Sequence, residues 1–300
     1  MKKSVAFKNG QINIAGNLYL PEGFDENKKY SGIVVAHPGG GVKEQTAGLY
    51  AERLSNQGYI SLAFDASCQG DSEGSPRLLE DPYARVEDVR CAVDYLTTLP
   101  YVDRDKIGAL GVCAGGGYVV AATQTERRIK AVATVSAVDL GAMFRGEASV
   151  ETQLQTLEAV ANQRTAEANG TEVNLQTWAP DSQEDIDENT PMLMREAYDY
   201  YRTPRAQHPN SPNRFRFTSV DKILSFSASA QIGTYLTQPM LLIVGTEADT
   251  RGYSDQFYAL SNGPKELFEV EGATHIAMYD IPEYVGQAVT KLSEFYGANL

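Results

Sequence analysis

Short apolar runs alternate with helical patterns along most of the chain. The first two runs lie on either side of Asn9-Gly10, a dipeptide typical of a tight β-hairpin turn. Six later runs are almost continuous in apolar residues, as strands buried on both faces are. They cover 32–37, 59–64, 106–112, 131–136, 239–245 and 266–270. The pattern therefore predicts a hairpin followed by a mostly parallel sheet.

Helical patterns fill the spaces between these runs. Between 82 and 99, for example, Val86, Val89 and Val93 recur at the spacing that puts them on one face of a helix. Other helices are expected at 43–57, 114–125, 254–261 and 282–296. Buried strands that alternate with helices predict an α/β fold whose central sheet is covered on both faces.

The alternation stops after Asp139 and resumes only near Gln238. The intervening stretch is rich in Gln, Glu, Thr, Asn and Tyr and carries helical patterns at 150–168 and 191–201. A connection of this length within a compact domain is normally functional or forms a subdomain. We therefore expect a helical cap inserted into the core. The expected division is a core of 1–138 and 226–300 and a cap of 139–225.

A cysteine lies where the strand at 106–112 meets the next helix, in Gly111-Val112-Cys113-Ala114-Gly115. A nucleophile at such a sharp turn needs small residues two positions before and after it, because the backbone is crowded there. The start of the helix favours a thiolate, which should lower the pKa of the thiol. The sequence predicts Cys113 as a nucleophile, and the alternative is a small buried core residue.

A general base for this thiol is expected late in the chain, on the loop after the last strand. Of the three histidines, His275 in Gly272-Ala273-Thr274-His275 has that position. His208 lies in a proline-rich part of the insertion, and His37 is expected to hydrogen-bond its own turn. We therefore predict that His275 deprotonates the thiol, the alternative being a structural imidazole.

A carboxylate would complete this pair by orienting the imidazole and stabilising its cation. The turn after the strand at 239–245 offers Asp249, the first choice, and Glu247, the second. Asp139, which follows the strand at 131–136, is the third. Whichever two of these do not contact the imidazole are expected to be ordinary acidic turn residues.

Acyl transfer also needs N–H donors for the oxyanion that develops on the substrate. The amide of Ala114, directly after the nucleophile, is one expected donor. The second is expected from His37-Pro38-Gly39-Gly40-Gly41, and because Pro38 has no N–H, Gly39 or Gly40 must supply it. These glycines could instead form only a flexible turn or a phosphate loop, but no Gly-Lys-Ser/Thr string accompanies them.

Composition narrows the classes of partner. A net charge of −13 argues against nucleic acid and anionic membranes, because like charges repel. No apolar run approaches the length of a membrane span or a signal peptide. Three cysteines without metal-type spacing suit a reducing compartment. We expect a cytoplasmic monomer or homodimer that acts on a small acyl substrate and uses no metal.

The order of nucleophile, acid and histidine, with the nucleophile at a strand-to-helix elbow, resembles the α/β-hydrolase superfamily over nearly the whole chain. A cysteine in the elbow resembles its dienelactone hydrolase branch. More narrowly, four segments resemble the YcjY-like proteins, which are similar to fungal polyketide transferases and thiohydrolases. These segments are 37–45, 64–67, 111–118 and 272–275.

The resemblance implies hydrolysis or transfer of an ester, thioester or lactone acyl group without a cofactor. The family pattern Gly-x-x-Asp would place the acid at Ala248, so this chain departs from the family there. Three other functions could use the same residues: a binding protein without turnover, a peptidase, and a redox-sensing thiol. The presence of both Cys113 and His275 argues against the first.

Overall fold

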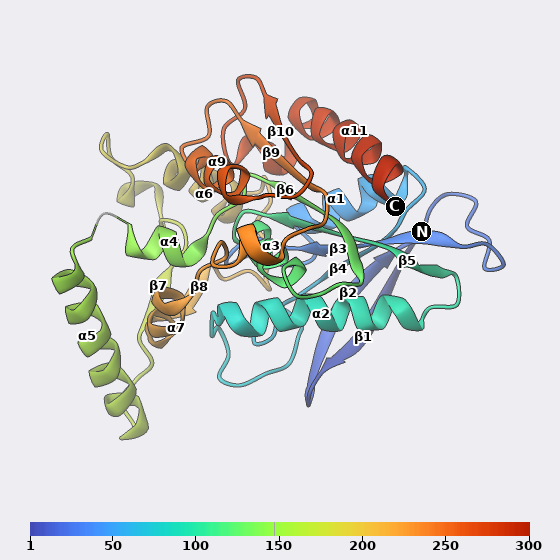
Figure 1. The fold of residues 1–300 in the computed structure, drawn as a ribbon. Coiled ribbons are helices and arrows are strands. Elements are labelled where there is room, and N and C mark those ends of the chain that lie inside the picture. The colour runs from blue at the N-terminus through green and yellow to red at the C-terminus, as the bar shows by residue number, and fades with distance from the viewer. Residues whose placement is uncertain (147) are drawn as a thin grey trace.

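The computed structural model describes residues 1–146 and 148–300, and an eight-stranded sheet lies at its centre (Figure 1). The strands are β1 (Lys2–Asn9), β2 (Ile12–Tyr19), β3 (Tyr30–Ala36), β4 (Ile60–Phe64), β5 (Val102–Val112), β6 (Ile129–Val135), β9 (Met240–Gly245) and β10 (Lys265–Val270). Their order is β1-β2-β4-β3-β5-β6-β9-β10. The two pairs that include β2 are antiparallel and all other pairs are parallel. The hairpin and the mostly parallel sheet predicted from the sequence are confirmed.

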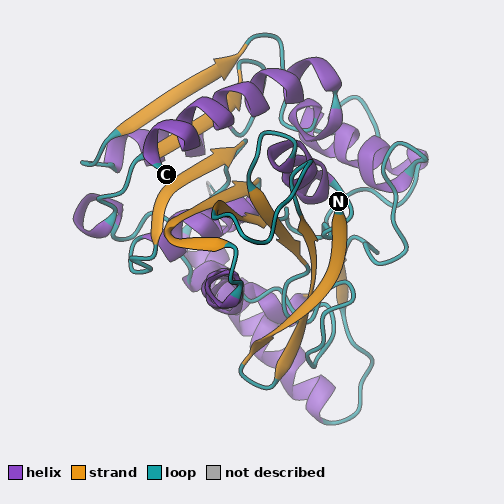
Figure 2. Ribbon diagram, turned by 90° about the vertical axis from the view of Figure 1, so that its right-hand side faces the viewer, coloured by secondary structure: helices purple, strands orange, loops and turns teal. Residues whose placement is uncertain are grey.

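Helices cover both faces of this twisted sheet (Figure 2). One face packs against α2 (Pro82–Thr98) and α3 (Ala114–Thr123), and the other against α1 (Thr46–Ser55) and α11 (Pro282–Asn299). Neighbouring residues of β3 therefore enter different cores, Val34 with the first pair of helices and Ile33 with the second. None of the helices in the described residues is both long and apolar enough to cross a bilayer. The predicted α/β-hydrolase architecture is confirmed.

Several elements begin at other residues than the periodicity indicated, and two of them show why. Helix α1 was expected from residue 43 but begins at Thr46, because the Lys43 side chain is held in a buried ion cluster instead. Strand β5 was expected from residue 106 but begins at Val102, which pairs with Tyr30 before the register shifts. Pairing with a neighbouring strand extends β5 through polar residues that its own pattern does not mark as strand.

The segment between β6 and β9 forms a separate set of short elements. They are α4 (Leu140–Arg145), α5 (Val150–Ala168), β7 (Leu175–Thr177), η1 (Gln183–Asp185), α6 (Met192–Arg202), β8 (Arg214–Arg216), η2 (Phe217–Ser219), α7 (Val220–Ser225) and α8 (Ile232–Tyr235). The helices predicted at 150–168 and 191–201 are confirmed as α5 and α6. The antiparallel ribbon of β7 and β8 was not predicted, because two strands of three residues are too short to show periodicity. The cap boundaries at 139 and 225 stay a prediction.

Candidate active site

Cys113 lies at the turn between β5 and α3 with a φ of 56°. Such a positive φ is unusual for a residue with a side chain and marks a strained turn. A Cβ added to Gly111 would lie 2.1 Å from the carbonyl oxygen of Gly115, and one added to Gly115 would lie 2.4 Å from that of Ala36. Only glycine fits at both positions, as the elbow pattern predicted. The turn holds the thiol at the carboxyl edge of the sheet.

Three hydrogen-bonding groups surround the thiol of Cys113. They are the Tyr279 hydroxyl and the backbone N–H groups of Ala114 and Gly39, and each lowers the pKa of the thiol. Burial is the largest effect and raises that pKa above its ordinary value. The expectation that the helix start would give a low pKa is therefore wrong in this structure, because removal of water outweighs the nearby dipoles. The resting side chain is a neutral thiol.

The His275 ring lies on the loop after β10 and is fully enclosed. Its Nε2 is 3.1 Å from the Tyr279 hydroxyl, and its Nδ1 is 2.5 Å from Oγ1 of Thr250. Burial lowers the pKa of the ring to about 3. The imidazole is therefore neutral at every pH above that value, so it has a free lone pair with which to accept a proton.

Tyr279 connects the two predicted catalytic residues. Its hydroxyl hydrogen-bonds both to the thiol of Cys113 and to the ring of His275. A base needs the tautomer in which Nδ1 carries the proton and donates to Thr250, which leaves Nε2 to accept from Tyr279. With the thiol neutral, its S–H donates to the Tyr279 oxygen while the Tyr279 O–H donates to Nε2, so a chain of hydrogen bonds runs from the sulfur through Tyr279 and the imidazole to Thr250. The sequence reasoning missed Tyr279, although it lies four residues after His275, one helical turn away.

None of the three candidate carboxylates is bonded to the ring. Asp249 is exposed, and its Oδ2 accepts from the Leu193 N–H at 3.1 Å. Glu247 is exposed as well. Asp139 is buried, and it accepts hydrogen bonds from the Ala142 N–H in α4 and from the Ala228 N–H, which precedes α8. The expected contact between Asp249 and His275 is therefore corrected: the turn before α9 (Arg251–Leu260) directs its residue 250, and not residue 249, toward the imidazole.

The substitution Thr250→Val is expected to reduce kcat/KM on the order of tenfold. Valine keeps the shape but removes the partner of Nδ1, and a lost hydrogen bond at a buried group costs roughly 1–3 kcal/mol. Steady-state ester hydrolysis measures the effect, and Thr250→Ser, which retains the hydroxyl, is the matched control. Equal rates for the valine and serine variants would show that Thr250 does not orient the ring.

The glycine loop after β3 supplies the second amide at the sulfur. Of the two expected donors, the Gly39 N–H contacts the thiol. Gly40 has a φ of 71°, and a Cβ added to it would lie 2.4 Å from the ring of Trp178, which covers both glycines. The Gly40 carbonyl accepts from the Ser211 hydroxyl at 2.6 Å. The insertion therefore packs directly onto the loop that carries the Gly39 N–H.

Arg85 hydrogen-bonds the start of this loop. Its guanidinium donates to the His37 carbonyl at 2.8 Å and lies 4.9 Å from the centre of the Tyr118 ring. The His37 ring bonds at Nδ1 to the Pro38 carbonyl at 2.7 Å, and burial together with Arg85 lowers its pKa well below the ordinary value. His37 therefore acts in its own turn, as the sequence indicated.

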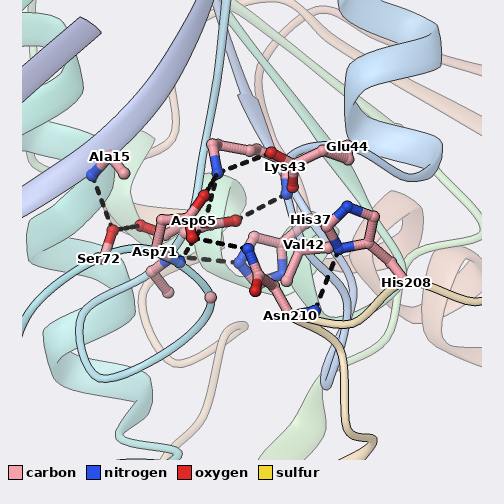
Figure 3. A network of polar contacts seen from close by, with 12 residues as sticks. Ala15, His37, Val42, Lys43, Glu44, Asp65, Asp71, Ser72, His208 and Asn210 are labelled. Atoms are coloured by element: carbon pink, nitrogen blue, oxygen red, sulfur yellow. Dashed lines mark hydrogen bonds and ion pairs between the residues drawn. The ribbon is translucent and has the colours of Figure 1, made fainter. Parts of the chain in front are cut away.

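A buried ion cluster joins the same loop to the insertion (Figure 3). The Lys43 ammonium lies 2.8 Å from Asp65 and 2.7 Å from Asp71. Asp71 in turn accepts from the Asn210 side chain at 2.7 Å, and the Asn210 N–H donates to His208. Burial alone would lower the pKa of Lys43, but its hydrogen bonds to the carboxylates raise it. The Lys43–Asp71 ion pair and the bond from Asn210 therefore tie residues 208–210 to the core.

A cavity of about 210 Å³ opens above the thiol. Its floor is Cys113, Ala114 and Gly39, one side is His275 and Tyr279, and the opposite wall comes from the insertion. Ligands of open parallel sheets bind outside the carboxyl ends of the strands, which is where this cavity lies. Within 1–146 and 148–300 no group of three or more His, Cys, Asp or Glu residues could hold a metal ion.

The sheet order and the sharp strand-to-helix turn at Cys113 together define an α/β-hydrolase. Residues 14–140 match the dienelactone hydrolase family, and residues 86–197 match the family described as BAAT / acyl-CoA thioester hydrolase C terminal. The chain belongs to the dienelactone hydrolase-related group that includes YcjY of Escherichia coli K12, to which it is 42% identical over the full length of both proteins. It is thus a hydrolase of ester or thioester bonds.

Two further relatives place the chain within this group. The crystal structure of PA2218 from Pseudomonas aeruginosa superposes with a TM-score of 0.91 at 31% identity, over 100% of this chain and 94% of that one. The thiohydrolase aneE of Aspergillus aculeatus is 32% identical over 52% of this chain and 48% of its own length. The first covers the insertion as well as the core, and the second covers about half of each protein.

Proposed function

We propose that this protein cleaves, or transfers the acyl group of, a small ester, thioester or lactone through a covalent intermediate on Cys113. The observation that carries the proposal is the convergence on one thiol of two backbone N–H donors and a hydroxyl–imidazole chain. The donors suit a developing oxyanion, and the chain suits removal of a proton. The Thr250 hydroxyl takes the orienting position that an acid occupies in a triad.

Acylation proceeds by attack of the Cys113 sulfur on the substrate carbonyl. As the S–C bond forms, the thiol proton passes to the Tyr279 oxygen and the Tyr279 proton passes to Nε2 of His275. The N–H groups of Ala114 and Gly39 hold the oxyanion. When the intermediate collapses, the protonated ring returns a proton through Tyr279 to the departing alkoxide or thiolate.

Deacylation reverses these roles. A water molecule, or an alcohol or thiol acceptor, gives its proton to His275 and attacks the acyl carbon. The Cys113 sulfur leaves and takes the proton from His275 through Tyr279, which restores the neutral thiol and imidazole. With water the product is a carboxylic acid, and with another acceptor it is a new ester or thioester. A thioester substrate exchanges one thiolate for another of similar leaving ability, which fits the thiohydrolase relative.

A substrate panel tests the proposal. Purified protein is mixed with a p-nitrophenyl ester, a thioester and an aminoacyl-arylamide, and product release and intact mass are followed. The proposal expects an added acyl mass on Cys113 and turnover of the ester or thioester. Cleavage of the arylamide alone would indicate a peptidase, and a stable adduct without product would indicate a binding protein. A thiol of raised pKa does not suit a redox sensor, which needs an accessible thiolate.

The rate at which iodoacetamide alkylates Cys113 is expected to rise about tenfold per pH unit from pH 7 to 9. Alkylation follows the thiolate fraction, and a pKa above its ordinary value keeps that fraction small throughout this range. The neutral His275 ring adds no step near pH 6.5, because its pKa lies far lower. Peptide mapping separates Cys113 from Cys91, whose pKa burial raises to about 11. A plateau below pH 7 would instead show a preformed thiolate–imidazolium pair.

A further inference from the structure

The wall of the cavity facing the thiol is aromatic and comes from the insertion. Phe144 of α4, Trp178 after β7 and Phe215 of β8 pack against one another, with ring centres 4.4–6.2 Å apart. Leu140 and Met143 extend this wall. Among the described lining residues there is no Asp, Glu, Lys or Arg. A charged acyl group would lose its hydration there without finding a counter-ion.

The size of the cavity limits what can enter. An apolar cavity of about 150 Å³ in another protein holds one benzene molecule. The present cavity of 210 Å³ therefore has room for one aromatic ring and about two further non-hydrogen atoms. This assumes that a water-sized group takes up about 30 Å³. A long straight acyl chain exceeds this space and would have to displace the aromatic wall or leave through the open side of the cavity. The edges and faces of the Phe144, Trp178 and Phe215 rings can also stack against an aromatic acyl group, which favours such a group.

We propose that the acyl group that enters this cavity is uncharged and compact, of the size of a substituted phenyl ring or a short branched chain. This inference rests on the proposed function, because it concerns the acyl part of the same substrate. The insertion sets the preference, since Phe144, Trp178 and Phe215 all belong to it. The core supplies the thiol, its donors and the base, and adds Val138 and Ile276 to the apolar lining.

A series of p-nitrophenyl esters tests the substrate class. Benzoate and butanoate are expected to exceed dodecanoate and monosuccinate in kcat/KM by at least about tenfold, which is the scale of pocket discrimination by a few methylene groups. Phe144→Ala and, separately, Met143→Ala should open the wall and raise the rate for dodecanoate relative to butanoate. Phe24→Ala, which removes a ring outside the cavity, should leave that ratio unchanged.

The outcomes separate the two proposals. If no ester acylates Cys113, the proposed function fails. If all four acylate it and dodecanoate or monosuccinate reacts as fast as benzoate, the enzyme remains and the compact, uncharged acyl class is overturned. An unchanged chain-length ratio in both wall variants would likewise overturn it, because the wall would not set the limit.

A second inference rests on a different observation, the hydroxyl of Tyr201. This residue of α6 lines the cavity and is buried. Its hydroxyl lies beside that of Tyr279 but forms no hydrogen bond of good geometry with any of the described residues. A Cβ added to Gly41 would lie 3.5 Å from this oxygen, so the hydroxyl adjoins the glycine loop. Burial is the largest effect on its pKa and raises it, and Cys113 adds to the rise. A buried polar group without a partner calls for a ligand or another explanation.

We propose that the Tyr201 hydroxyl donates a third hydrogen bond to the oxyanion formed on the substrate. It belongs to the insertion, whereas Ala114 and Gly39 belong to the core. The insertion then takes part in the reaction and does not only enclose it. Loss of one oxyanion donor typically lowers kcat about a hundredfold or more.

Tyr201→Phe is therefore expected to lower kcat about a hundredfold with little change in KM and in the melting temperature. The matched control is Tyr200→Phe, on the same helix and equally buried but outside the cavity, which should retain the wild-type rate. A rise in KM alone, or equal rates for the two variants, would overturn the donor role. Acylation of Cys113 in either case would leave the proposed function standing.

Discussion

Cys113→Ala is expected to abolish the acyl adduct and to lower kcat/KM on the order of 10⁴-fold or more. The sulfur is the only described nucleophile that has both amide donors and the Tyr279–His275 chain beside it. Alanine fits the elbow, so the donors and the cavity remain. Removal of the nucleophile from a comparable triad costs about 10⁶-fold, while the oxyanion donors still give some rate over water. Intact-mass analysis after mixing with p-nitrophenyl butanoate measures the adduct directly.

Two further variants make this result specific. Cys91→Ala removes a cysteine of α2 that does not line the cavity, and it should acylate as wild type does. Cys113→Ser keeps the elbow and the attacking position but offers a hydroxyl of much higher pKa, so it should react far more slowly than the cysteine. An acyl adduct that persists in Cys113→Ala would assign the chemistry to another residue and end the proposal.

The fold was predictable because its sheet is buried on both faces. Strands such as β9 are continuous apolar runs, and these stand out from the helices around them. The elbow was predictable for a related reason. Its crowded backbone admits only glycine at 111 and 115, so the steric requirement is visible in the sequence as two glycines. Both are local requirements that a single segment of sequence can display.

The hydrogen-bond chain was not predictable in the same way. Thr250 and Tyr279 are common residue types that carry no motif, and each becomes functional only through its distance to His275. The order of strands indicated an acid at the turn after β9, and two acidic residues were present there. Which side chain of that turn faces the ring depends on how α9 begins, and the sequence does not specify this. The family position of the acid is Ala248, which has no polar group at all.

The direction of the thiol pKa is a second case in which tertiary structure overrides local chemistry. A helix start and two N–H donors favour the thiolate, and these are visible in the elbow sequence. The insertion then encloses the sulfur in an apolar cavity, and the loss of water dominates. With a thiol of raised pKa beside an imidazole of pKa about 3, the proton stays on sulfur at rest. Proton removal must accompany attack on the substrate.

His275→Gln is therefore expected to lower kcat/KM about a thousandfold. Glutamine approximates the shape of the ring and can still hydrogen-bond Tyr279, but it cannot take up a proton. General-base catalysis contributes roughly 10²- to 10⁴-fold, and a thiol of raised pKa depends on it more than a preformed thiolate would. Steady-state hydrolysis of a butanoate ester from pH 6 to 10 measures the loss. In the variant the rate should rise with hydroxide over the whole range, because only the spontaneous thiolate reacts.

Tyr279→Phe distinguishes a relay from direct contact. If the hydroxyl carries the proton between sulfur and Nε2, its removal leaves a gap between them, and the loss should approach that of His275→Gln. If the ring can turn to meet the sulfur itself, Tyr279→Phe should retain most of the rate while His275→Gln does not. A His275→Gln variant with wild-type kcat/KM and an unchanged pH profile would remove the imidazole from the mechanism. The neutral, fully enclosed ring would then be a packing residue, and the thiol would need a different base.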